Sequence, residues 1–274
     1  MWSVVQIHSS RPFRIVALIL LTNDDGIEAE GLQRLRAALR DFADVIVVAP
    51  DRERSAVSHG LTLRAPLTLR AAGENQYTLD GTPADCIIYA LESVTPAVPD
   101  LVISGINHGA NLGDDIMYSG TVAAAREAAH QGLRALAVSQ AYDDSPIDFT
   151  RGVKFVSALV KRLLARSGDG AFCLNVNIPV RRIRGVKITR QGCGPPLPHF
   201  NALDRAARAQ PAAAGAPKDS RDDIPLDYQA VRDHYISVTP LQNDQTDYAM
   251  VEELRRQARS LFPGRRIPGI GLIG

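Results

Sequence analysis

The stretch that decides the fold is IVALILLTNDDG, residues 15–26. Residues 15–21 form an unbroken apolar run, which is far shorter than the roughly 20 residues needed to span a bilayer. The residues after it are not small ones typical of a signal-peptide cleavage site. A short apolar run without alternation favours a strand that is buried on both faces of a sheet. We therefore predict such a strand here, followed by a polar turn.

The same kind of run recurs along the chain and alternates with helical patterns. Further strands are predicted at residues 45–49, 100–104, 135–139 and 173–178. Apolar residues at helical spacing, or a helix start signal, are found at residues 32–42, from residue 82 onward, at 121–130 and at 153–164. This alternation indicates an α/β fold: an open, mostly parallel, doubly wound (Rossmann-like) sheet with right-handed crossovers.

Residues 14–200 are expected to form this Rossmann-like domain. A hairpin is expected to project from it at about residues 61–79, where apolar and polar residues alternate. Residues 201–226 are rich in alanine, proline and charge, so we expect a mobile loop there. Residues 227–274 should form a small extension, with a strand at 235–240 and a helix at 246–260.

Composition narrows the possible partners. The chain of 274 residues has 31 Lys and Arg against 30 Asp and Glu, a net charge of +1. It therefore lacks the basic excess of nucleic-acid binders, and we expect neither a nucleic-acid nor a membrane partner. Its three cysteines, at 86, 173 and 193, are too far apart for a zinc or redox motif, and their number argues against a disulfide framework. Reduced thiols in a cytoplasmic protein are the expectation.

Three polar loops follow three of the predicted strands. They are residues 22–26, 50–55 and 105–111. The carboxyl ends of parallel strands lie together in an open sheet, and ligands bind in the crevice there. Two carboxylates, a hydroxyl and at least one amide oxygen from these loops should converge, and all of these are oxygen donors of the kind that Mg²⁺ or Mn²⁺ prefers. The adjacent carboxylates of Asp24 and Asp25 would repel each other unless one is protonated or a cation lies between them.

Each loop residue also has a structural explanation. Asp-Asp-Gly is a turn signature whose carboxylates complement a helix dipole. Ser55 taken alone is a helix cap, and Asn107 taken alone is a residue that tolerates a left-handed conformation. His108 is weak evidence for acid–base catalysis. It is the coincidence of three such loops after three apolar strands that favours a binding site.

A fourth segment, Tyr118-Ser119-Gly120-Thr121, precedes an alanine-rich helix. Amides and hydroxyls at a helix N-terminus bind anions, although the same residues also serve as helix caps. We assign phosphate binding to Asn111, Ser119, Gly120 and Thr121. A metal and an anion site in one crevice together predict phosphate chemistry.

At these residues the sequence closely resembles the SurE family of stationary-phase survival proteins, which are 5′/3′-nucleotidases. The matching blocks are LLTNDDG (20–26), VVAPDRERSA (47–56), GTPADC (81–86), LVISGINHGANLGDDIMYSGTVAAAREA (101–128), LNVNIP (174–179), ITRQG (188–192) and YISVTPLQND (235–244). The Ala/Pro-rich sequence around 206–217 departs from the family, which has an aromatic, glycine-containing hairpin there.

The resemblance implies a function and a site. It implies nucleoside monophosphates as substrates, and a homodimer or homotetramer built through the C-terminal part. It also implies one divalent ion, Mg²⁺ or Mn²⁺, bound by Asp24, Asp25, Ser55 and Asn107. Asp24 and Asp25 are then the expected catalytic residues, and an aspartate or His108 takes the proton from the attacking water.

Three other functions are possible for such a fold, and each has a different requirement. An aspartyl-phosphate phosphatase needs two aspartates one residue apart after the first strand, whereas here they are adjacent. A non-catalytic dinucleotide-binding module needs G-x-G-x-x-G at the first turn, which is absent. A phosphatase fold that has kept only a binding role differs in lacking activity.

Overall fold

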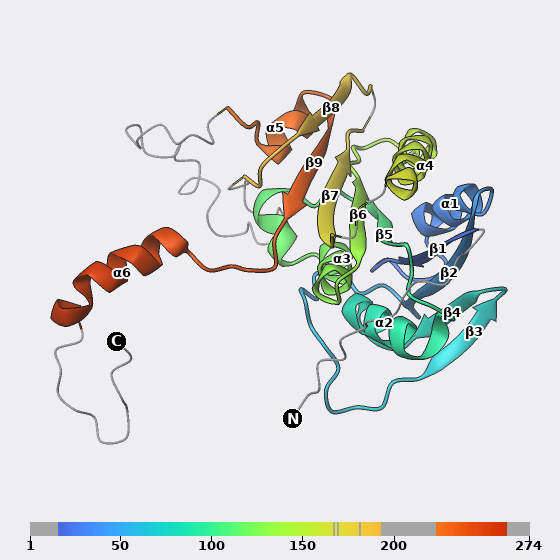
Figure 1. Cartoon of the computed structure of the whole chain (residues 1–274). Coiled ribbons are helices and arrows are strands. Elements are labelled where there is room, and N and C mark those ends of the chain that lie inside the picture. Colours follow the sequence, from blue (N-terminus) through green and yellow to red (C-terminus); the bar gives the residue numbers. More distant parts are fainter. Residues whose placement is uncertain (1–15, 167, 169, 181, 193–222, 262–274) are drawn as a thin grey trace. The chain divides into compact units, whose positions relative to one another are not determined.

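A computed structural model describes residues 16–166, 168, 170–180, 182–192 and 223–261, with side chains to residue 257 in the last range. The chain divides into two units, one ending at Leu241 and one beginning at Gln242. In the described part of the first unit, a nine-stranded sheet has the order β3-β4-β2-β1-β5-β6-β7-β9-β8, and helices pack on both of its faces (Figure 1).

The element bounds agree closely with the predicted pattern. The strands are β1 (Ala17–Thr22), β2 (Ala43–Pro50), β3 (Leu69–Gly73), β4 (Gln76–Leu79), β5 (Leu101–His108), β6 (Arg134–Gln140), β7 (Phe172–Ile178), β8 (Gly185–Ile188) and β9 (Tyr235–Leu241). The helices are α1 (Glu30–Leu39), α2 (Pro83–Tyr89), the π-helix η1 (Ala90–Val94), the 3₁₀-helix η2 (Gly113–Met117), α3 (Gly120–His130), α4 (Thr150–Ala165), α5 (Asp227–Arg232) and α6 (Tyr248–Leu261). In the described part of the chain, no helix is both long and apolar enough to cross a membrane.

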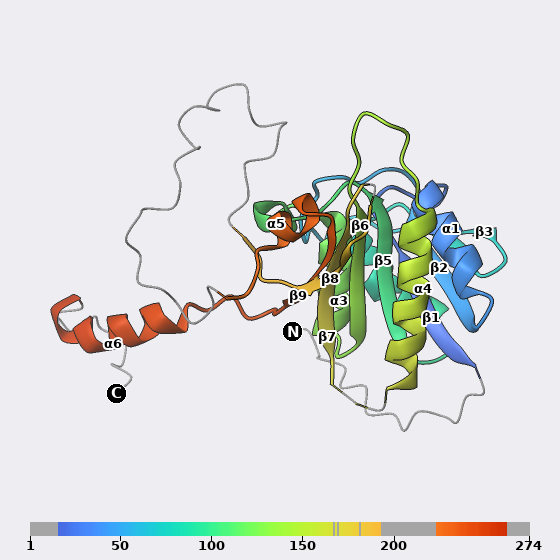
Figure 2. The same cartoon turned by 90° about the horizontal axis from the view of Figure 1, so that it is seen from above.

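The central strands are buried on both faces, as the unbroken apolar runs predict. Ile19 and Leu21 of β1 belong to the core under α1 and α4. Leu18 and Leu20 belong to the core on the other face, under α2 and α3. Figure 2 shows α4 on one side of the sheet and α3 on the other. The doubly wound α/β fold is confirmed.

The strand order reverses direction between β1 and β5. Both strands are parallel neighbours, with Leu20 paired to Val102, yet from β1 the chain passes to β2 on one side and later to β5 on the other. In open α/β sheets the crevice at such a reversal, outside the carboxyl ends of the strands, is where ligands bind. The loops after β1 and β5 therefore lie beside the fold's natural binding position.

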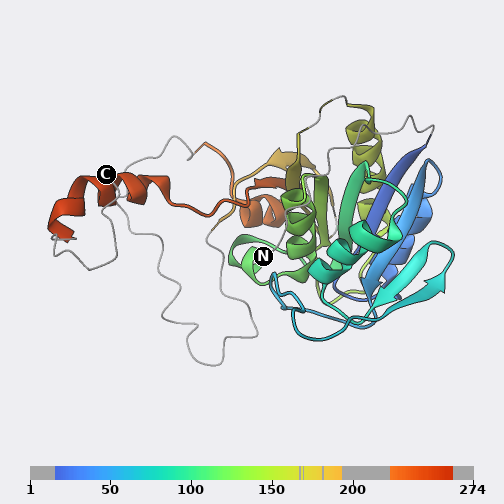
Figure 3. The ribbon, with the colours of Figure 1, turned by 60° about the horizontal axis from the view of Figure 1, so that its bottom comes forward.

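The hairpin predicted at about residues 61–79 is shorter and does not project. It consists of β3 and β4 only, and β4 pairs in parallel with β2, with Val47 opposite Gln76 (Figure 3). The hairpin therefore extends the main sheet at its edge. The outer strand β3 is largely exposed. An alternating pattern does not identify the strand with which a segment pairs.

The C-terminal strand predicted at 235–240 is also part of the main sheet. β9 runs antiparallel to β7 and parallel to β8, a strand that the sequence pattern did not reveal. The compact unit consequently extends beyond residue 200, to Leu241. The predicted terminal helix is present as α6, in the second unit. Of the loop expected at 201–226, residues up to 222 lie outside the described part, and Leu226 forms a bridge with Arg190.

A close approach of backbone fixes α1 beside β5. A Cβ atom at Gly31 would lie 2.1 Å from the carbonyl oxygen of Ile106, so no side chain fits there. We expect Gly31→Ala to lower the free energy of unfolding by about 1–3 kcal/mol or more, the usual cost of overpacking. Urea denaturation measures this. The matched control is Gly170→Ala, where nothing lies within 4 Å of the new atom. Equal stability of the two variants would contradict the close approach.

Candidate active site

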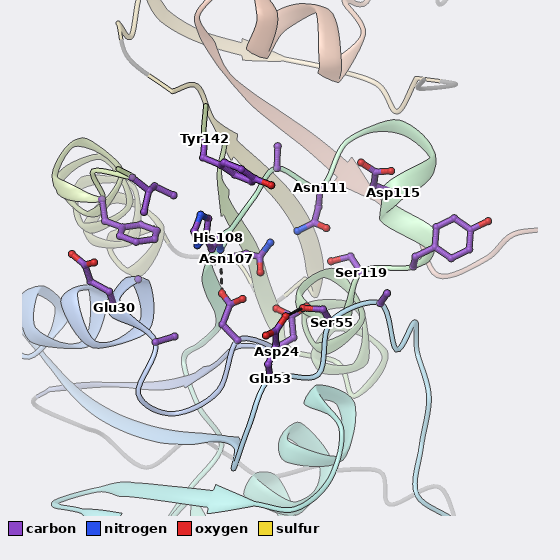
Figure 4. Close-up of a pocket in the computed structure, with 18 residues that line it drawn as sticks. Asp24, Glu30, Glu53, Ser55, Asn107, His108, Asn111, Asp115, Ser119 and Tyr142 are labelled. Atoms are coloured by element: carbon purple, nitrogen blue, oxygen red, sulfur yellow. Dashed lines mark hydrogen bonds between the residues drawn. The ribbon is translucent and has the colours of Figure 1, made fainter. Parts of the chain in front are cut away.

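A cavity of about 900 Å³ opens at the carboxyl edge of the sheet (Figure 4). Loops after β1, β2 and β6, the end of β5 and the segment before α3 all contribute to its walls. Six of the eight predicted site residues line it: Asp24, Asp25, Ser55, Asn107, Asn111 and Ser119. Side chains far apart in sequence therefore meet where the strand order reverses. Gly120 and Thr121 lie directly behind this surface, against Asp24.

Asp24 is held by the N-terminus of α3. The backbone N–H of Thr121 donates to Oδ2 of Asp24 at 3.1 Å, and the hydroxyl of Thr121 donates to Oδ1. A Cβ at Gly120 would lie 3.0 Å from the Cβ of Asp24, so glycine permits this approach. Thr121 was predicted to bind phosphate, but both of its donors are directed at Asp24. In this geometry it positions the carboxylate instead.

Asp25 joins the β1 turn to the end of β5. Its Oδ2 accepts a hydrogen bond of 3.1 Å from the backbone N–H of His108. Burial raises the pKa of Asp25, the contacts with His108 oppose this rise, and the charge of Glu53 adds to it. The neighbouring carboxyl is perturbed more strongly. Burial raises the pKa of Asp24 to about 6, with a further contribution from Asp25 and opposition from the Thr121 hydrogen bonds.

These shifts reflect two adjacent carboxylates that are removed from water. Desolvation and like charge both disfavour the ionised form, so it is unfavourable for both carboxyl groups to be ionised at neutral pH. A bound cation reverses both effects. The pair therefore fits a cation site better than it fits a capping role alone.

Ser55 and Asn107 present oxygen atoms beside this pair. Ser55 donates its hydroxyl proton to Oε1 of Glu53 at 2.7 Å, which leaves its oxygen lone pairs as acceptors. Asn107 donates through Nδ2 to the carbonyl of Gly109 at 2.8 Å, so that Oδ1 is the acceptor end of the amide. Asn107 lies within β5, after an irregularity in its pairing with β6, and not in a loop as predicted.

The donor set is made of oxygen atoms only. No group of three or more His, Cys, Asp and Glu side chains in the described residues is arranged to hold a metal. A cation here would rely on two carboxylates and on the neutral oxygens of Ser55 and Asn107. Hard ions such as Mg²⁺ and Mn²⁺ accept such ligands and keep several waters. The residues present fit a divalent cation of this kind.

Asn111 is fixed by a buried polar network. Its Nδ2 donates to Oγ of Ser139 at 2.8 Å, and its backbone N–H donates to Oδ1 of Asn177 at 2.8 Å. Asn175 and Asn177 both donate to its carbonyl. Sequence reasoning did not assign these two asparagines, although two amides in an otherwise apolar buried strand are a usable signal. They hold one wall of the pocket rigid.

Ser119 caps α3 and lines the pocket at the same time. Its Oγ accepts from the N–H of Val122 at 3.1 Å, so its hydroxyl proton is directed elsewhere. Further polar or aromatic lining residues were not predicted, among them Glu53, Asp115 and Tyr142. Burial raises the pKa of Asp115 to about 6, with contributions from Asp114 and Asp227. Each follows a strand end or precedes α3, at the same edge of the sheet.

Fold and pocket together define an open α/β protein with an acidic pocket where the strand order reverses. Residues 19–195 match the family model described as Survival protein SurE. The chain is 43% identical over 245 residues to the 5′-nucleotidase SurE of Pelotomaculum thermopropionicum, covering 87% of this chain and 94% of that protein. It is 42% identical over 246 residues to the 5′-nucleotidase SurE of Vibrio cholerae serotype O1, covering 86% and 95%.

A solved structure agrees with these relatives. The SurE protein from Aquifex aeolicus matches with a TM-score of 0.73 at 36% identity, over 88% of this chain and 99% of that one. The chain belongs to the SurE family.

The raised pKa of Asp24 gives a test of the site in metal-free protein. The folded state holds this proton more tightly than the unfolded state, whose carboxyl titrates near 3.8. Its contribution to stability is therefore full below that pH and lost as the pH rises through about 6. The loss is about 3 kcal/mol for a shift of this size.

Asp24→Asn removes the ionisation and retains a group able to bond with Thr121. In EDTA at pH 7.5 we expect the variant to be more stable than the parent, by up to about 3 kcal/mol, and similar to it at pH 4. Urea denaturation at both pH values measures this, with the exposed Asp44→Asn as the matched control. A variant much less stable than the parent at pH 7.5 would show that the charge of Asp24 is structural.

Proposed function

We propose that the protein is a metal-dependent phosphomonoesterase that hydrolyses nucleoside 5′- and 3′-monophosphates to nucleoside and phosphate. The observation that carries this is the pair of adjacent carboxylates, the buried Asp24 and the half-buried Asp25, beside the N-terminus of α3. The carboxylates favour a bound cation, and the helix N-terminus favours a bound anion. Metal-dependent hydrolysis of a phosphate ester needs a site for each. Relatives named 5′-nucleotidase SurE support the same activity.

In this proposal Asp24, Asp25, Ser55 and Asn107 hold one Mg²⁺ or Mn²⁺. When bound, the ion acts as a Lewis acid toward the phosphate and lowers the pKa of a water molecule. Thr121 keeps Asp24 in position. Glu53 orients the hydroxyl of Ser55, and the backbone N–H of His108 orients Asp25.

The phosphate would be held on the opposite side of the carboxylates. Ser119 has a hydroxyl proton to donate, and Asn111 is rigid and lines the same wall. The dipole of α3 favours an anion at this end, and the backbone of Gly120 lies beside it. The attacking water would lose its proton to an aspartate or to His108, which line the pocket.

The geometry of Asp24 also bears on the alternative aspartyl-phosphate mechanism, in which a carboxylate attacks the phosphorus. A carboxylate that acts as a nucleophile needs an accessible oxygen. Asp24 is 4% exposed and both of its oxygens accept hydrogen bonds from Thr121. This argues against Asp24 as the nucleophile that attacks phosphorus.

Assembly and location are also proposals. We propose a homodimer or homotetramer built through the C-terminal part, because α6 exposes the apolar side chains of Tyr248, Met250 and Leu254. We propose a cytoplasmic location, because Cys86 and Cys173 are buried free thiols, which persist in a reducing compartment.

The activity is tested with a panel of nucleoside monophosphates. We expect phosphate release that requires added Mg²⁺ or Mn²⁺ and is abolished by EDTA. Colorimetric detection of phosphate across bases, and across 5′ and 3′ esters, measures this. Undiminished hydrolysis after exhaustive chelation would contradict the metal role, and no hydrolysis of any ester would leave a binding function.

The proposed metal ligands should differ in how much each contributes to metal affinity and to kcat. We expect Asp25→Asn to lower kcat by at least 100-fold, because it removes a charged ligand, with removal of single electrostatic groups at active sites costing about 10²–10³. Ser55→Ala should weaken metal affinity only modestly, because water can replace a neutral hydroxyl. Ser58→Ala, in the same loop but outside the pocket lining, is the control. Equal and complete loss of metal in Ser55→Ala and Asp25→Asn would contradict this order.

A further inference from the structure

The pocket has two unlike sides (Figure 4). In the close-up the polar Asp115 and Ser119 lie on one side of the pocket and the ring of Tyr142 lies on the other, and Ile147 and Phe149 are further apolar lining residues. The carboxylate of Asp24 lies beside Ser55, below both Tyr142 and Asn111 in the close-up. A ligand that fills this cavity therefore meets a polar end and an aromatic end.

Tyr142 is held at the rim and remains open to solvent. It follows the end of β6 and its ring meets the ring of His108 edge-on, with centroids 4.8 Å apart and planes at 80°. Even so, the residue is 56% exposed. An oriented aromatic ring that is not buried in a core is a surface for a second flat group.

His108 connects this ring to the proposed metal site. Its backbone N–H donates to Asp25 at 3.1 Å, and its side chain contacts Tyr142. One residue thus sets the spacing between the carboxylates and the aromatic ring. A ligand spanning the two needs an anionic end and a flat end joined by a short linker.

The volume points to the same ligand. A cavity of about 900 Å³ is in the range that encloses a whole small molecule, and exceeds what a phosphate group alone requires. A nucleotide has the required layout: phosphate, then ribose, then a base with a π-face. Stacking on an aromatic ring accepts any base, because each base has such a face.

We propose that Tyr142 is a specificity-determining residue that stacks on the nucleobase of the substrate. This rests on the proposed nucleotidase function and assigns the substrate's base to a place in the same pocket. Recognition by stacking selects nucleotides over phosphate esters that lack a base, without selecting among bases.

The test compares adenosine 5′-monophosphate with ribose 5-phosphate, which lacks the base. Tyr142→Ala should raise KM for the nucleotide about tenfold, equivalent to about 1.4 kcal/mol, with kcat and the KM for ribose 5-phosphate unchanged. Tyr142→Phe keeps the ring and should restore the parent values. Thermal melting of both variants should match the parent, because the side chain is largely exposed. Equal effects on both substrates, or none on the nucleotide, would overturn the proposal.

A binding measurement separates this inference from the proposed function. Calorimetric titration with adenosine, which has no phosphate, should show binding that is about tenfold weaker in Tyr142→Ala. If the parent hydrolyses neither ester, the nucleotidase proposal fails, and the adenosine titration alone decides the role of Tyr142. Equal adenosine affinity in parent and variant would overturn it.

Discussion

Thr121 donates two hydrogen bonds to a carboxylate that the fold has buried, and the geometry of the site depends on this contact. Asp24 follows the end of β1, and its carboxylate accepts hydrogen bonds at the N-terminus of α3. This helix begins almost a hundred residues further along the chain. The contact fixes a charge where water cannot screen it and brings the carboxylate of Asp25 beside it. Burial then raises both pKa values. In the folded protein, ionisation of these two neighbouring carboxyl groups is therefore unfavourable, and a bound cation would offset this cost.

The topology of the sheet accounts for the position of the two carboxylates. Because the strand order reverses between β1 and β5, their carboxyl ends leave a crevice that no crossover helix fills. Asp25 and His108 bridge the crevice through one hydrogen bond. On one side the buried asparagines of β7 hold Asn111, and on the other His108 orients Tyr142. Both walls are therefore anchored to the sheet through these contacts, whereas the loop that begins at Asp51 brings Ser55 to the pocket.

Much of this could be predicted from the sequence. Unbroken apolar runs such as residues 15–21 indicated parallel strands, and the convergence of strand ends then placed Asp24, Asp25, Ser55 and Asn107 together. The role of Thr121 could not be predicted, because capping a helix, binding an anion and holding a carboxylate all use the same donors. Tyr142 follows the end of a predicted strand, but it lies in a connection without periodicity and carries no metal or phosphate ligand, so it was not assigned to the pocket. The pairing of β4 and the presence of β8 were missed because strands of four residues carry too little pattern.

The central claim is that the two carboxylates form a cation site that is unfavourable when empty. The most direct measurement is the melting temperature of the parent and of Asp25→Asn at pH 7.5, in EDTA and in saturating Mn²⁺. A ligand that binds only the folded state adds RT ln(1 + [L]/Kd), about 2.7 kcal/mol at a hundredfold excess over Kd. The parent should therefore melt several degrees higher with Mn²⁺, and the variant should lose most of that rise. An equal rise in both proteins, or no rise in the parent, would contradict the account.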